Sequence, residues 1–365
     1  MSESAPDLLY SEAEEDLRAA VRSLLADRMD TPSALARAES DTPYDQGLWQ
    51  SLGADMGLAG LLVPEKLGGQ GAGHREAAVV LEEIGRTVAP VPYLTSAVIA
   101  TETLLALDTS SGEVAGLVKE LASGRRTAAL AVPFAYGPDS LRLSGGLDGM
   151  VSGVADAATA DVLLVPTGQG LYAVEAHDAV IAPLVPLDLT RPLATVTFDG
   201  ARGTLLADAE TGRAAVRRGL LAGAGLLASE QLGVAEWCLT ESVAYTRDRK
   251  QFNRPVGSFQ ALKHRMAQLW LEVVSARAAA RNAADALATG SPDAPLAVAV
   301  AQAYCSGVAV RAAEECVQLH GGIGMTWEHP AHLYLKRAKS AQLALGSAGE
   351  HRAAVAGIVG LPGPA

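Results

Sequence analysis

The chain is poor in cysteine, in aromatic residues and in charge. Its 365 residues include three cysteines, 4% aromatic residues and 19% charged residues. Cys238, Cys305 and Cys316 form no CxxC pair and lie in helical patterns, which predicts small buried residues of a reducing compartment. The net charge of −12 is the opposite of the basic excess that a nucleic-acid surface requires, so we expect no nucleic-acid partner.

Other features are missing as well. The acidic start Met-Ser-Glu-Ser is unlike a secretory leader, and no uninterrupted apolar run is long enough to span a bilayer. We therefore expect a cytoplasmic protein without a membrane span. No Gly-x-Ser-x-Gly elbow is present, which argues against a serine hydrolase. The glycines at 68–71 lack the spacing of a dinucleotide fingerprint and predict a turn.

Hydrophobic residues make up 49% of the chain, enough for two or three domains. Helical periodicity at Leu17, Val21, Leu24 and Leu25 predicts that residues 1–40 form mainly one amphipathic helix, and a further helix is expected at about 95–107. Short apolar runs between turn residues, from about 128 to 207, predict a small β-barrel or sandwich.

After residue 209 the pattern is helical again. Short breaks between long helices predict antiparallel packing in a bundle. The expected helices span about 211–247, 256–289, 293–319, 328–344 and 348–358. We therefore predict an α+β protein with an N-terminal helical domain (1–125), a middle β domain (126–208) and a C-terminal helical bundle (209–365).

Two motifs in the C-terminal region carry the functional signal. The first runs from Tyr245 to Asn253, and its three basic residues hold enough charge for a pyrophosphate. The second, Gln318-Leu-His-Gly-Gly-Ile-Gly324, combines an amide with a glycine pair that lets a ligand approach the backbone. Taken alone, Arg249 is typical of a solvated helix end and the glycines of a helix C-cap.

Together with Phe259-Gln260, these motifs resemble those of the acyl-CoA dehydrogenase family of FAD flavoproteins. Trp49-x-x-Leu52 and Val63-Pro-Glu-x-x-Gly-Gly69 also resemble the family, so the resemblance covers nearly the whole chain. It implies the family's fold with a four-helix C-terminal bundle, an FAD cofactor, an acyl-CoA substrate and electron-transfer flavoprotein as an electron acceptor. It also implies a dimer in which the two motifs of one chain grip the FAD of its neighbour. The residues so implied are Arg249, which holds the pyrophosphate, Gln251, Phe252, Phe259, Gln260, Gln318, Leu319, Gly321 and Gly322.

The chain departs from the family where a base is expected. The family's proton-accepting Glu usually precedes Gly-Thr or Gly-Ser near the end of the chain, and here Leu345 stands before Gly346. Some members carry the Glu on the first C-terminal helix, where this chain has Gly223. Neither residue accepts a proton. Two flavin-facing segments of the middle domain also differ from the family pattern, at 133–140 and at Met150-Val-Ser152.

Three other carboxylates are candidate bases. Glu350 belongs to a Ser-x-x-Glu capping box, Glu230 lies about two helical turns from the family position, and Glu328 is more distant. His320, His329 and His332 raise the question of a metal. Because no set of four well-spaced ligands is present, we expect none. The basic cluster Lys336, Arg337 and Lys339 is more typical of a surface than of a phosphate site.

These departures lead to three hypotheses. The first is a subunit of a heteromeric acyl-CoA dehydrogenase that shares an FAD site but has no catalytic residue, its partner chain carrying the catalytic Glu. Resemblance to such subunits implies steroid side-chain CoA thioesters as substrates. The second is a self-sufficient, homo-oligomeric dehydrogenase with a relocated base. The third is a flavin-free scaffold protein.

Overall fold

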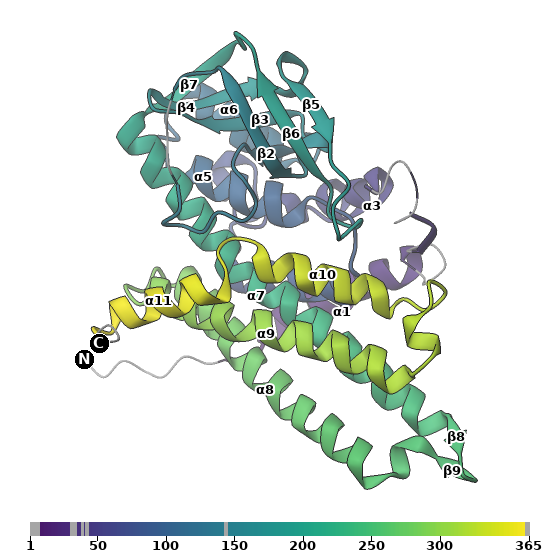
Figure 1. The fold of residues 1–365 in the computed structure, drawn as a ribbon. Helices are drawn as coiled ribbons and strands as arrows, with labels where there is room; N and C mark the ends of the chain where they lie inside the picture. Colours follow the sequence, from purple (N-terminus) through teal and green to yellow (C-terminus); the bar gives the residue numbers. More distant parts are fainter. Residues whose placement is uncertain (1–7, 30–34, 38–39, 41–43, 142–144, 362–365) are drawn as a thin grey trace.

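The computed structural model describes residues 8–29, 35–37, 40, 44–141 and 145–361. Helices dominate both ends of the chain, and strands occupy the middle (Figure 1). The N-terminal helices are α1 (Glu12–Arg28), α3 (Gln46–Trp49), α4 (His74–Thr87), α5 (Thr101–Leu105) and α6 (Gly112–Ala122). The family fold predicted from the resemblance is confirmed by this arrangement together with the comparisons reported below.

The predicted first helix is shorter than expected. It begins after Ser11, whose hydroxyl accepts a hydrogen bond from the Glu14 amide while the Glu14 carboxylate accepts one from Ser11, and it ends at Arg28. The segment predicted as a helix at about 95–107 is a π-helical stretch, Tyr93–Ala100, followed by α5. The Thr101 hydroxyl donates to the Ser96 carbonyl 3.0 Å away, inside this wider helix. The turn predicted at the glycine-rich segment is confirmed, with left-handed φ angles at Gly68 and Gly71.

In the described part of the middle region, seven strands form two sheets that enclose one small core. The first sheet has the order β1 (Ala128–Leu130), β3 (Val162–Pro166), β4 (Gly170–Glu175) and β7 (Gly203–Asp208). The second has the order β2 (Gly149–Ala155), β6 (Leu193–Phe198) and β5 (Val180–Pro183). Only the β1–β3 pair is parallel. Val154, Leu163, Val196 and Phe198 are buried between the sheets, in the region where short apolar runs predicted strands.

The C-terminal region is a bundle of α7 (Ala209–Asp248), α8 (Gln260–Ala288), α9 (Ala294–His320) and α10 (Ala331–Leu343), with α11 (Ala348–Ile358) against α9. The predicted helices are confirmed to within a few residues. A two-stranded hairpin, β8 (Lys250–Gln251) and β9 (Arg254–Pro255), joins α7 to α8. This hairpin lies at the end of the bundle farthest from the sheets (Figure 1).

Helices α4 and α7 cross closely enough to exclude side chains at two positions. A Cβ atom added at Gly85 would lie 2.1 Å from the Glu230 carbonyl oxygen, and one at Gly233 would lie 2.0 Å from that of Glu82. The two glycines therefore let α4 pack directly on the backbone of α7. This packing positions the elements around the small cavity described in the next subsection.

Helix α9 corrects one prediction. Among the described residues it is the one helix long and apolar enough to cross a membrane, although the sequence pattern suggested no such stretch. However, 67% of its most apolar window is buried against the rest of the protein. This burial is typical of the central helix of a bundle.

Candidate functional site

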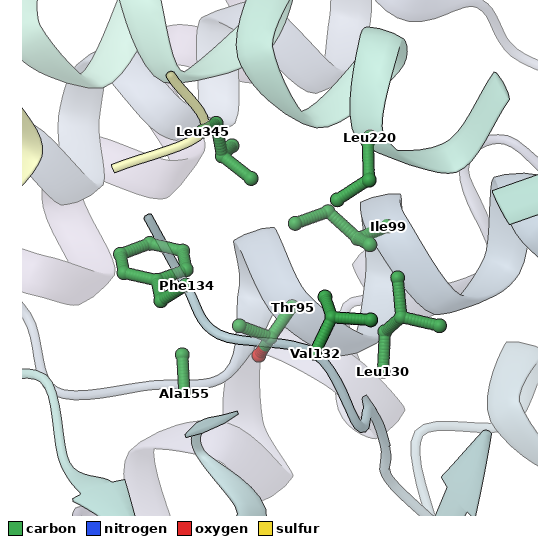
Figure 2. Close-up of a pocket in the computed structure, with 8 residues that line it drawn as sticks. All are labelled: Thr95, Ile99, Leu130, Val132, Phe134, Ala155, Leu220 and Leu345. Atoms are coloured by element: carbon green, nitrogen blue, oxygen red, sulfur yellow. The ribbon is translucent and has the colours of Figure 1, made fainter. Parts of the chain in front are cut away.

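Of the two positions at which the family carries its base, Leu345 lines a small cavity, and Gly223 lies against the side chains of Ile99 and Leu345. The cavity measures about 20 Å³, which is room for about one water molecule. Figure 2 shows Leu345, Ile99 and Leu220 pointing toward one another across it. A Cβ atom added at Gly223 would lie 3.3 Å from Leu345 Cδ1 and 2.5 Å from Ile99 Cγ1. The lining residues, none of them ionisable, are Thr95, Ile99, Leu130, Val132, Phe134, Ala155, Leu220 and Leu345.

Main-chain hydrogen bonds close one side of this cavity. The Leu345 amide donates to the Phe134 carbonyl oxygen at 2.8 Å, and the Gly346 amide donates to that of Ala135 at 3.1 Å. Leu345 itself has a left-handed backbone, with a φ of 54°. His351 Nε2 donates to the Leu345 carbonyl oxygen at 3.0 Å. The segment before α11 is therefore fixed directly to the middle-domain loop, and apolar side chains fill the space between them.

Glu230 is held in a buried ion network. Its carboxylate lies 2.5 Å from Arg191 Nη2 and 3.0 Å from Arg337 Nη1, and Arg337 Nε lies 2.6 Å from Asp188. Burial acts to raise the pKa of Glu230, but the two guanidinium groups outweigh it and hold the pKa below its usual value. A carboxylate fixed in the ionised form between two cations is poorly suited to accept a proton.

The other two candidate bases do not line the cavity either. Glu350 forms the capping box predicted from the sequence, since the Ser347 amide donates to its carboxylate at 2.7 Å and the Glu350 amide donates to the Ser347 hydroxyl at 3.2 Å. The bonds from Ser347 lower the pKa of Glu350. Glu328 is exposed in the loop before α10.

The two predicted FAD motifs meet at the far end of the bundle. The rings of Tyr245, on α7, and His320, at the end of α9, lie 4.3 Å apart between their centroids. Arg249 follows the last residue of α7, and Gly321 follows the last residue of α9. The fold thus brings together two motifs that are about seventy residues apart in the sequence.

The hairpin between α7 and α8 presents an exposed aromatic ring. Phe252 and Asn253 form its two-residue turn, with φ angles of 53° and 60°. Asn tolerates this conformation, whereas Phe adopts it at a cost in backbone strain. Phe252 is 86% exposed, and its ring and that of Phe259 are in a T-shaped arrangement with their centroids 6.1 Å apart. The guanidinium of Arg254 lies 3.9 Å from the Phe259 ring centroid, which braces the hairpin.

The polar groups at this end of the bundle fit an anionic, pyrophosphate-bearing cofactor. Within the described residues, the side chains of Arg249, Lys250 and Gln318 have no hydrogen-bond or ion-pair partner, and all three are exposed. A Cβ atom added at Gly321 or Gly322 would meet nothing within 4 Å, so the backbone there is open to a ligand. The remaining predicted contacts, Gln251 and Gln260, are exposed, Phe259 is half-buried and Leu319 is buried.

The two segments that the family resemblance places beside the flavin line a separate surface depression of about 430 Å³. Tyr136 comes from the loop, and Met150 and Ser152 come from β2. Met150 is 69% exposed, and the Ser152 hydroxyl is hydrogen-bonded to that of Thr195 at 3.0 Å. The fold therefore places these segments side by side, with no aromatic ring at the position of Met150.

Comparison with known proteins identifies the fold. Residues 11–122 match the model of the acyl-CoA dehydrogenase N-terminal domain, and residues 210–359 match that of the acyl-CoA dehydrogenase C-terminal domain. The chain is 37% identical over 335 residues to acyl-CoA dehydrogenase IpdE2 of Mycolicibacterium smegmatis, covering 91% of this chain and 94% of that protein. The chain belongs to the acyl-CoA dehydrogenase family.

Solved structures of this family agree with that assignment. A chain of the ChsE4–ChsE5 complex from Mycobacterium tuberculosis superposes with a TM-score of 0.86 at 26% identity, covering 98% of this chain and 100% of that one. A chain of the Tcur3481–Tcur3483 steroid acyl-CoA dehydrogenase superposes with a TM-score of 0.84 at 26% identity, covering 96% and 98%. Acyl-CoA dehydrogenases depend on FAD, and the open, cationic end of the bundle is consistent with that cofactor.

Sequence reasoning missed the buried ion network. Arg337 is 1% exposed, so its assignment to a surface charge cluster with Lys336 and Lys339 was wrong, whereas Lys339 does form a surface pair with Glu314 at 2.8 Å. No local sequence pattern shows which residues pair in the network, because Arg337 and its acidic partners come from separate parts of the chain. The sequence does show that Arg337 occupies a position of α10 whose helical neighbours are mostly apolar, which is a signal of burial.

Proposed function

We propose that this acyl-CoA dehydrogenase is the subunit of a heteromeric enzyme that completes an FAD site on a partner chain and contributes no catalytic base. The proposal is carried by the apolar surroundings of Leu345 and Gly223. Removing an α-proton from an acyl-CoA requires a carboxylate within hydrogen-bond reach of that proton. Here the two family positions for such a carboxylate are held by Leu345 and Gly223, and the cavity beside Leu345 holds about one water molecule.

The exposed end of the bundle supports the sharing of a cofactor. Arg249 and Lys250 carry two positive charges without a partner in the described part of the chain, and Gln318 offers an unpaired amide. In this role Arg249 binds the pyrophosphate, and Gly321 and Gly322 let the cofactor approach the backbone. Phe252 covers an apolar part of the cofactor with its exposed ring. FAD supplies the redox chemistry when it is bound, and this chain holds and orients it.

The proposed substrate is a steroid-derived acyl-CoA thioester. The support is similarity to the ChsE4–ChsE5 complex and to the Tcur3481–Tcur3483 steroid enzyme, each of which is named for two chains. The partner of this chain is accordingly a second acyl-CoA dehydrogenase chain that carries the catalytic Glu. Electron-transfer flavoprotein is the proposed electron acceptor, and the complex is proposed to be cytoplasmic.

The alternatives make different demands on the chain. A self-sufficient homo-oligomeric enzyme needs a base, and Glu230 and Glu350 are already held in an ion network and a capping box. Turnover of an acyl-CoA by this chain purified alone would support that alternative. A flavin-free scaffold needs no open cationic site. The absence of flavin from every native complex would favour it.

The first experiment is the FAD-to-chain ratio of the complex isolated from its native host through a tag on this subunit. We expect one FAD for every two chains, together with a second dehydrogenase chain. One FAD per chain in a homo-oligomer would refute the proposal.

The second experiment tests the cationic hairpin. Arg249→Ala should lower the FAD content of the complex, because Arg249 is the proposed pyrophosphate contact. Arg213→Ala is the matched control, since Arg213 is also exposed on α7 but at its opposite end. Unchanged FAD content in Arg249→Ala, or an equal loss in Arg213→Ala, would contradict the shared site.

A further inference from the structure

Three side chains of metal-ligating types lie close together near the C-terminal ends of α7 and α9. Glu241 comes from α7, His320 from the last turn of α9, and His329 from the loop before α10. One potential ligand atom from each lies within 4.8 Å of the others. The two imidazole rings lie 4.3 Å apart between their centroids. The sequence pattern predicted no metal because no set of four well-spaced ligands is present, but the fold brings Glu241 to these histidines from a distant part of the chain.

The hydrogen bonds of His320 leave one ring nitrogen bare. Its Nδ1 lies 2.7 Å from the Cys316 carbonyl oxygen. A carbonyl oxygen only accepts, so Nδ1 carries the proton and Nε2 presents a lone pair. The side chain is 3% exposed, and Nε2 has no hydrogen-bond partner in the described part of the chain. A buried lone pair of this kind is costly, and a backbone carbonyl on the opposite nitrogen is the usual support of a metal-binding histidine.

Glu241 is likewise unpartnered. Its side chain is half-buried, and within the described residues it makes no hydrogen bond and no ion pair. A metal ion between this carboxylate and Nε2 of His320 would neutralise the negative charge of Glu241 and would give the Nε2 lone pair a partner.

We propose that Glu241, His320 and His329 bind one divalent transition-metal ion, with zinc as the expected occupant. Two imidazoles and one carboxylate form a ligand set that zinc accepts, with a water in the fourth position. With metal–ligand bonds of about 2.1 Å, neighbouring ligands in a tetrahedral site lie about 3.4 Å apart, so ligand atoms that now lie within 4.8 Å of one another must approach by up to about 1.4 Å. His329 must also release the 3.2 Å bond that its Nδ1 accepts from the Ala331 amide.

The position of the cluster gives the ion a structural role. His320 lies between Leu319 and Gly321 of the second motif, and its ring faces Tyr245 of the first. A bound ion would therefore brace the ends of α7 and α9 against the loop before α10. The inference does not depend on the proposed sharing of FAD, because it concerns side chains of this chain alone.

The test is a titration of the chelator-stripped, full-length chain in its native complex with Co²⁺, followed by visible ligand-field absorption and calorimetry. We expect saturation at one Co²⁺ per chain in this subunit and displacement by Zn²⁺. Glu241→Gln and His329→Gln should each weaken binding at least about tenfold, as the loss of a ligand does. His332→Gln, a third histidine nearby but outside the cluster, should leave the affinity unchanged.

Three results would overturn the inference: no saturable binding, unchanged affinity in Glu241→Gln, or an equal loss of affinity in His332→Gln. Circular dichroism of each variant reports folding. Glu241→Gln preserves the shape of a half-buried residue that has no partner to lose, which keeps the test decisive if His329→Gln disturbs the loop.

Discussion

Replacing Leu345 by alanine should destabilise the chain without affecting turnover by the complex. Leu345 is 1% exposed and borders an existing cavity. The substitution removes three buried carbon atoms, which corresponds to about 2.4 kcal/mol of lost transfer free energy at about 0.8 kcal/mol for each. The enlarged void adds a cavity cost, so we expect a loss of about 3 kcal/mol in the free energy of unfolding.

The backbone of Leu345 sharpens this prediction. Its left-handed φ of 54° costs a leucine or an alanine roughly 1 kcal/mol, but costs a glycine little. Leu345→Gly should therefore be no less stable than Leu345→Ala, although glycine fills less of the cavity. If packing alone decided stability, without backbone strain, Leu345→Gly would have a lower free energy of unfolding than Leu345→Ala.

The assay is urea unfolding of the complex, together with steady-state turnover of its acyl-CoA substrate. Leu343→Ala is the matched control, because Leu343 is 65% exposed two residues away and should change stability by less than about 0.5 kcal/mol. Turnover of Leu345→Ala should stay within about twofold of the wild type. A tenfold loss of turnover with unchanged stability would place Leu345 in a working active site and refute the reasoning.

Three further substitutions test the packing and the charges around the site. Glu230→Gln should lower the free energy of unfolding by about 3 kcal/mol at pH 7, because it leaves Arg337 and Arg191 partly unpaired. The pKa of Glu230 in the folded chain lies below its ordinary 4.5, so the stabilisation is present above pH 4.5 and is lost as the pH falls. In urea titrations the stability difference between Glu230→Gln and the wild type should be about 1 kcal/mol smaller at pH 4 than at pH 7. A difference that stays constant with pH would contradict this. Gly233→Ala should lower the free energy of unfolding, measured by thermal unfolding, by at least about 2 kcal/mol, because the new Cβ atom would lie 2.0 Å from a backbone oxygen. The control is Gly116→Ala on α6, where a Cβ atom meets open space, and this change should be neutral or stabilising. Glu350→Ala should cost about 1 kcal/mol through loss of the helix cap and leave turnover unchanged, and a loss of turnover would reopen the assignment of Glu350 as a base.

Local sequence patterns predicted much of the fold. The Ser347–Glu350 capping box, the C-terminal helices and the short strands of the middle region all depend on neighbours in the sequence, and all three are present in the structure. The first helix was predicted too long, because the apolar spacing of Leu17 to Leu25 does not show where the helix ends.

Features that depend on distant residues were not predictable in the same way. The network of Arg337 with Asp188 and Glu230 joins three separate elements, so charge patterning placed Arg337 on the surface. The meeting of Tyr245 with His320 could be expected only through resemblance to the family. That Gly223 lies against the side chain of Leu345 depends on the packing of α7 against the segment before α11, which no single stretch of sequence contains.

Helix α7 is 40 residues long and therefore extends for about 60 Å. Gly223 lies near its middle and Arg249 just beyond its end, roughly 40 Å apart along the helix axis at 1.5 Å per residue. At that separation substitutions at the two positions act nearly independently on stability. Natural selection could thus relax at one position while it preserved the other, and a duplicated gene copy could lose one half of its chemistry in small, individually tolerated steps.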